Sequence, residues 1–231
     1  MNPHIGGRTR AGWISIPAQI LEGEFQSSGV KAPSTRQLLM IGVGAASIFG
    51  AVMGTFSGLA PGHFIQIALS AIKVPLLLLG SLTLCLPSFF VLNTLFGLRR
   101  DFSEAWRAIV MSQTALALVL CSLSPLTTVW YASSGSYRAA VLFNAVLFAM
   151  SSGSAQLLLH RLYQPLIRRN SKHRALLRVW LGIYIFVGIQ LGWVLRPFVG
   201  DPAAPVQWFR EDAWGNAYVT VAQLLWNLFR N

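Results

Sequence analysis

The sequence predicts an all-α, polytopic membrane helix bundle with about five spans and a short C-terminal amphipathic helix. The first observation is that five long runs contain no Lys, Arg, Asp or Glu: 37–62, 74–98, 108–137, 139–159 and 179–195. Each run is about as long as the roughly 20 apolar residues that cross a bilayer core. The second is composition, because only 11% of the 231 residues are charged, against about 25% in soluble domains.

The third observation is that basic residues gather between alternate pairs of runs. The N-terminal tail, the second connection and the segment 160–178 hold most Lys and Arg residues, whereas the intervening connections hold mainly Lys73, Arg138 and Arg196. By the positive-inside rule, this alternation predicts a cytoplasmic N-terminus and places the stretch after residue 195 outside. The net charge of +11 is therefore interpreted as topogenic, and nucleic acid is not expected as a partner.

The domain organisation follows from these runs. Residues 1–36 are expected to form a cytoplasmic tail with a possible interfacial helix, 37–195 the five-span bundle, and 196–231 an outer segment with an aromatic belt. No cleavable leader is apparent, so the first span is expected to act as its own insertion signal. Cys85 and Cys121 both lie inside apolar runs, where small core residues are favoured over a disulfide or metal pair.

The first span carries small residues at a four-residue step: Gly42, Ala46, Gly50, Gly54 and Gly58. They share one helix face, which lets a second helix approach closely in lipid. Internal packing is the favoured use of this face, and dimerisation is the alternative. The following stretch, 61–73, is interpreted as an interfacial helix leading into the second span, with Lys73 as a loop charge and His63 at headgroup level.

The second, third and fourth spans each carry polar or helix-breaking residues. Pro87 is expected to kink the second span and Pro125 the third. The fourth span contains a second small, polar face from Ser151 to Ser154. Buried amides are predicted in or between the spans at Asn93, Gln113, Asn144, Gln156 and Gln190. These amides would either form hydrogen bonds between helices or line a polar pathway.

The fifth span ends at Pro197, and an aromatic-rich segment follows it. A predicted outer cluster consists of Trp193, Arg196, Asp201, Trp208, Arg210 and Glu211. Its arginine either joins an ion-pair cluster or anchors alone to lipid phosphate. Residues 217–231 are amphipathic but short for a crossing, so an interfacial or re-entrant helix is favoured over a sixth span.

The basic segment 160–178 is predicted to be a cytoplasmic loop. Such segments attract anionic lipid, and the candidate residues are Arg168, Arg169, Lys172 and Arg174. A purely topogenic role for these charges is the simpler alternative, and it is favoured.

Two stretches carry a resemblance. They are LCLPSFFVLNTLFG at 84–97 and GWVLRPFVG at 192–200, which continues to Trp208-Phe209-Arg210. Together they resemble a family of small, uncharacterised bacterial multipass proteins, some of which carry an automatic label of actin-binding WH2 domain protein. The resemblance covers roughly residues 38–214 and implies a bacterial inner-membrane protein without an established activity. No WH2 helix with its short basic motif is present to support the actin label. The overall plan is also loosely similar to Yip1-like multispan proteins.

The sequence lacks motifs that would indicate an enzyme. The four histidines, His4, His63, His160 and His173, are expected in tails or loops, and neither an HExxH pattern nor a phosphate-binding loop is present. No cofactor, metal site or catalytic residue is expected, and the protein is predicted not to be an enzyme. The favoured function is a scaffold, assembly factor or accessory subunit that binds a membrane-protein partner or a second copy of itself. A small-solute transporter or channel is the alternative.

Overall fold

The computed structural model describes residues 33–58, 63–200 and 208–209, and these residues form helices and turns without a strand. Five helical segments are long and apolar enough to cross a membrane: Thr35–Ser57, Phe64–Leu95, Arg99–Ser133, Tyr137–Arg169 and Lys172–Val194. The predicted all-α bundle is therefore confirmed, and the chain is an integral, multipass membrane protein. The predicted helices in the N-terminal tail and at 217–231 lie outside the described residues.

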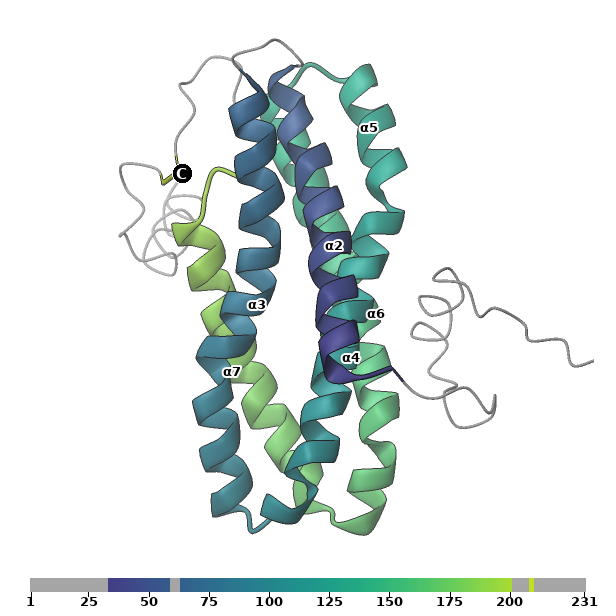
Figure 1. The fold of residues 1–231 in the computed structure, drawn as a ribbon, viewed down its shortest axis with the longest axis vertical. Coiled ribbons are helices and arrows are strands. Elements are labelled where there is room, and N and C mark those ends of the chain that lie inside the picture. The colour runs from purple at the N-terminus through teal and green to yellow at the C-terminus, as the bar shows by residue number, and fades with distance from the viewer. Residues whose placement is uncertain (1–32, 59–62, 201–207, 210–231) are drawn as a thin grey trace, which may run out of the picture.

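The first two spans pack tightly along each other. Helix α2 (Thr35–Gly54) starts with a capping box, in which Ser34 and Gln37 satisfy each other's backbone N–H groups. After the short η1 (Thr55–Ser57), helix α3 (Phe64–Leu95) runs back along the whole bundle (Figure 1). Its 32 residues correspond to about 48 Å at 1.5 Å per residue, which exceeds the roughly 30 Å hydrocarbon core.

The start of α3 corrects the sequence interpretation of 61–73. Lys73 was expected in a connection, but it lies inside α3, more than two turns beyond Phe64. The reason is that 64–72 is itself apolar and helix-compatible, so the second span begins earlier than the uncharged run. Gln66, Ser70 and Lys73 follow the i, i+4, i+7 spacing that places them on one face of this helix.

The third span consists of two helices. The turn η3 (Arg99–Asp101) leads into α4 (Phe102–Ser122), and α5 (Ser124–Ser133) follows after Leu123. Pro125 occupies the first turn of α5, where its missing N–H costs no helical hydrogen bond. The break lies where the sequence predicted it, whereas Pro87 stays within the continuous helix α3.

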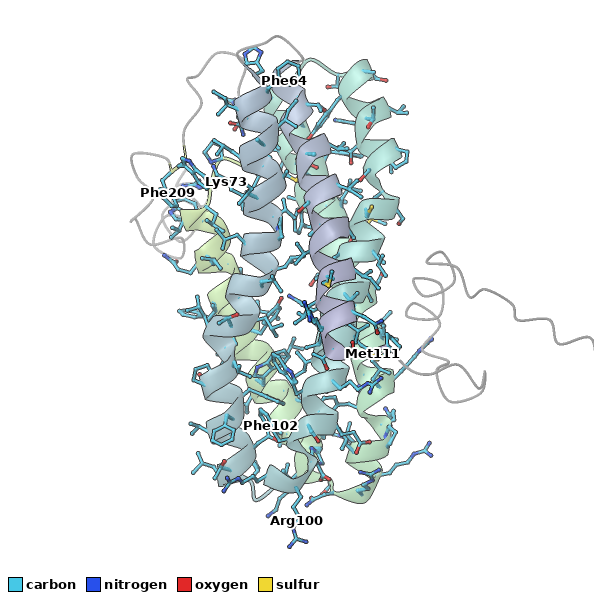
Figure 2. All side chains as sticks on the ribbon, viewed as in Figure 1. Phe64, Lys73, Arg100, Phe102, Met111 and Phe209 are labelled. Atoms are coloured by element: carbon cyan, nitrogen blue, oxygen red, sulfur yellow. The ribbon has the colours of Figure 1, made fainter. Side chains whose placement is uncertain are left out.

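Helices α6 (Tyr137–Arg169) and α7 (Lys172–Val194) complete the bundle, and only Asn170 and Ser171 separate them. The predicted basic loop 160–178 is therefore wrong, because most of it continues these two helices. The end of the bundle that carries Arg99, Arg100, Arg168, Arg169 and Lys172 is called the basic end, and Figure 2 shows Arg100 there. The opposite end, which carries Phe64 and the Ser134–Ser136 turn, is called the far end. From the basic end α6 and α7 diverge (Figure 1).

Candidate functional site

The small residues of α2 form a covered stripe. A Cβ atom on Gly50 would collide with the backbone oxygen of Ser70, and one on Gly54 would lie 2.6 Å from the Cα atom of Ile67. Nearer the basic end, Gly42 faces Thr114 of α4, and Ala46 is fully buried. The expectation that Gly58 shares this helix face is wrong, because Gly58 lies beyond α2 and η1 at a φ of 102°, which favours glycine. The stripe thus lets α3 and α4 approach α2 closely within this chain.

Helix α6 carries a second stripe of small residues, and this one is uncovered. Ala145, Ala149 and Gly153 recur every four residues, and all three are exposed. A Cβ atom on Gly153 would have no neighbour within 4 Å. The sequence pointed to this helix through Ser151–Ser154, of which Ser151 is buried and Ser154 is exposed. The two alanines were missed, because their exposure depends on which face of α6 the other helices cover.

Lys73 is the most unusual residue inside a span. Its side chain is fully buried, and its Nζ donates a hydrogen bond to the backbone oxygen of Pro197 at 3.0 Å. The Nζ atom also lies 5.9 Å from the ring centre of Trp208, within reach of a cation–π attraction. Figure 2 shows Lys73 on the flank of the bundle where Phe209 also lies. An ionisable residue within a span is a candidate functional residue.

The segment that follows α7 closes over this lysine. Ser70 donates a 2.6 Å hydrogen bond to the backbone oxygen of Phe198, and Gln66 donates to Ser70 at 3.1 Å. Gly200 sits so close to α3 and η1 that a Cβ atom there would lie 2.7 Å from Gln66 and 2.8 Å from Ser57. The segment 197–200, called the closing segment below, is therefore docked on the polar face of α3.

The predicted outer cluster is partly assembled. The guanidinium carbon of Arg196 lies 3.3 Å from the ring centre of Trp193, and its Nε donates to the Trp193 backbone oxygen at 3.1 Å. Trp208 lies near Lys73, a neighbour that the sequence did not suggest because the two residues are so far apart in the chain. Asp201, Arg210 and Glu211 lie outside the described residues, so the ion-pair hypothesis stays a prediction.

A pocket of about 590 Å³ lies between these features and α6. Its walls come from four segments far apart in the sequence: α2, α3, the first three turns of α6, and the end of α7 with the residues after it. The lining residues are Met53, Leu77, Tyr137, Arg138, Val141, Leu142, Asn144, Ala145, Phe148, Gly192, Arg196, Pro197, Phe198 and Val199. Sequence analysis named Asn144 and Arg196 but gave no reason to place them together.

The predicted intramembrane amides have separate partners. Gln113 on α4 donates to the backbone oxygen of Leu78 on α3 at 3.1 Å and bonds to the Tyr184 hydroxyl of α7. Asn93 is buried but donates at 2.8 Å to Phe89 of its own helix. Asn144 donates to the Tyr131 hydroxyl at 2.6 Å, which joins α6 to α5. Gln156 and Gln190 are half-buried. The structure therefore distributes these groups over four helices.

The basic end holds a second polar cluster. His173 is fully buried in the first turn of α7, and its Nε2 atom lies 3.0 Å from a carboxylate oxygen of Asp101. The expectation that His173 lies in a loop is therefore wrong. Arg169 donates to Glu104 at 2.7 Å. The other predicted lipid-binding residues, Arg168, Lys172 and Arg174, are exposed at this end.

No match to a known protein indicates the function of this chain. Within the described ranges, no group of three His, Cys, Asp or Glu side chains is placed to hold a metal ion. No family model, no curated protein and no solved structure matches this chain. The candidate site consists of three features: the exposed stripe of α6, Lys73 with the closing segment, and the pocket.

Proposed function

We propose that the protein is a non-enzymatic scaffold, assembly factor or accessory subunit that binds a second membrane protein through α6. The observation that carries this proposal is the exposed stripe of Ala145, Ala149 and Gly153. Small residues in lipid favour close helix association, because van der Waals packing replaces the hydrophobic drive that is absent there. A membrane protein or a second copy of this chain is the fitting partner.

The distribution of polar groups supports this function over transport. Proton-coupled transporters usually place acidic groups inside their spans, whereas the described acids, Asp101 and Glu104, lie at the basic end. Ser112 donates to the Ala155 backbone oxygen at 2.9 Å and Thr114 to that of Leu38 at 3.1 Å. These hydroxyl groups join helices instead of lining a path.

A small-solute transporter is the second candidate, and Lys73 is the observation that favours it. A buried ammonium group beside a pocket wall is one way to hold an anion during passage. In this structure the lysine donates to Pro197 of the closing segment, so transport would require that segment to move away from α3.

The proposed location is a bacterial inner membrane with a cytoplasmic N-terminus. The basic end supports this orientation, because it gathers the Arg99–Arg100 pair with the basic residues of α6 and α7. A tag inserted between Asn170 and Ser171 should then be shielded from impermeant reagents added outside intact cells. Labelling of that tag from outside would reverse the orientation.

Purification in mild detergent distinguishes the two functions. The scaffold proposal predicts a stoichiometric partner chain, or a defined oligomer of this chain, identified by mass spectrometry and light scattering. It also predicts that liposomes containing the protein retain small anions and cations as well as empty liposomes do. A monomer without a partner, whose liposomes release a particular solute, would overturn the scaffold proposal in favour of transport.

A further inference from the structure

The pocket starts at the far end beside Arg138 and extends along apolar walls, whereas Arg196 lies nearer the middle of the bundle, next to the Pro197 that contacts Lys73. Arg138 lies in the first turn of α6 and Arg196 directly after α7, and both line the pocket. Leu142, Ala145 and Phe148 continue the α6 wall towards the middle of the bundle, and Leu77 of α3 contributes to the same enclosure. The ten residue steps from Arg138 to Phe148 correspond to about 15 Å along the helix axis.

The charge of the lining has one sign. Two arginines line the pocket, and no acidic residue is among its lining residues. Arg138 is exposed and makes no ion pair within the described part of the chain. Arginine presents a planar set of donors that matches phosphate oxygens. The charge therefore favours an anionic group in the pocket.

Asn144, in the α6 wall of the pocket, offers a ligand no accessible polar acceptor. Asn144 is 2% exposed and lines the pocket. Its amide nitrogen donates to Tyr131 and to the Ala140 backbone oxygen, but its Oδ1 atom has no hydrogen-bond partner among the described residues. This oxygen is covered by protein atoms, so a ligand in the pocket meets an apolar wall at this residue.

We propose that this pocket binds one anionic phospholipid of the leaflet at the far end. Its phosphate lies at Arg138, and an acyl chain lies along Leu142 and Phe148. The length supports this ligand, because about 15 Å of wall equals one half of a 30 Å hydrocarbon core. The site is separate from the basic residues at the opposite end, and it shares only Ala145 with the α6 stripe.

The test uses a phosphatidylglycerol that carries a photoreactive diazirine on its acyl chain. The full-length protein is reconstituted with this probe and irradiated, and the adducts are mapped by mass spectrometry. Adducts are expected on residues 141–148. Unlabelled phosphatidylglycerol should compete with the probe, and phosphatidylcholine of the same chain length should compete roughly fivefold less well, because a lipid-facing Arg contributes about 1 kcal/mol.

Two variants and one control make the result specific. Arg138→Gln should reduce labelling of 141–148 roughly fivefold. Leu77→Trp, which fills the pocket from α3, should abolish labelling there for either lipid. Arg174→Gln removes an exposed positive charge at the basic end and should leave this labelling unchanged. Equal competition by phosphatidylcholine, or unchanged labelling in both pocket variants, would overturn the proposal.

Discussion

The stripes of small residues on α2 and α6 differ in what covers them. On α2, Gly50 and Gly54 lie so close to α3 that an added methyl group would meet its backbone. On α6, Ala145, Ala149 and Gly153 are exposed, and a methyl group on Gly153 would meet open space. The same pattern of sequence therefore occurs in two settings: the α2 stripe is covered by α3 within the fold, and the α6 stripe is exposed.

This difference separates stability from association. A larger side chain on α2 must push apart two helices of the same bundle, so it changes folding. A larger side chain on the α6 stripe changes only the outer surface, so it should act on a partner alone. Substitutions in the two stripes therefore test different properties: stability for α2 and association with a partner for α6.

The largest effect is expected for Gly50→Leu. The new side chain collides with the α3 backbone at Ser70, which cannot rotate away, so the cost should reach about 3 kcal/mol or more. Thermal unfolding in detergent and size-exclusion chromatography measure it. Gly44→Leu is the matched control, because Gly44 lies on the same helix with nothing within 4 Å of its added Cβ. Equal stability of the two variants would contradict the close α2–α3 contact.

The next largest effect is expected at Ser70, which lies opposite Gly50 in the contact between α2 and α3. Ser70→Ala removes the donor to Phe198 and should cost about 1 to 2 kcal/mol, because a partly buried backbone oxygen loses its partner. It should also loosen the closing segment, which faster proteolysis near residue 198 would reveal. Ser154→Ala, which removes an exposed bond within α6, serves as the control. Identical proteolysis of the two variants would argue against docking of the closing segment.

A smaller effect is expected where α2 meets α4. Thr114→Val removes the hydroxyl that donates to the Leu38 backbone oxygen beside Gly42. Hydrogen bonds between helices in membranes contribute about 0.6 kcal/mol on average, so the melting temperature should fall slightly. Thr94→Val is the control, since exposed Thr94 bonds only within α3. A larger loss of stability for Thr94→Val than for Thr114→Val would show that the Thr114 hydrogen bond does not hold α2 against α4 near Gly42.

The smallest effect on stability is expected for Gly153→Leu. The residue faces open space, so unfolding should change by no more than about 0.5 kcal/mol. Recovery of the partner, or of the second copy, should nevertheless fall about tenfold, which corresponds to 1.4 kcal/mol of association free energy. Full recovery of the partner at unchanged stability would show that α6 is not the interface. It would leave the close contact between α2 and α3 unaffected.

The sequence was sufficient for the spans and the α2 stripe. Charged residues are excluded from the bilayer core, so uncharged runs mark the helices, and the four-residue step of glycines marks a packing face. Helix ends were harder to predict. Lys73 looked like a boundary because a lone ammonium is costly in lipid, but the closing segment supplies a carbonyl partner that no local pattern reveals.

Tertiary contacts account for what was missed. Ala145 and Ala149 occur among Val, Leu and Met, and only the packing of the other helices leaves their face uncovered. The pocket combines residues from four segments, so no single spacing predicts it. His173 looked like a loop residue within the basic segment, but only two residues separate α6 from α7, so it lies in the first turn of α7 and is buried there.

Photocrosslinking in intact membranes tests most directly whether the α6 stripe meets another protein. A photoreactive amino acid is placed at position 153 in one variant and at position 44 in another, both of which are exposed within a span. The account predicts that position 153 crosslinks to a second protein chain, whereas position 44 crosslinks to lipid. Lipid adducts alone at both positions would contradict it.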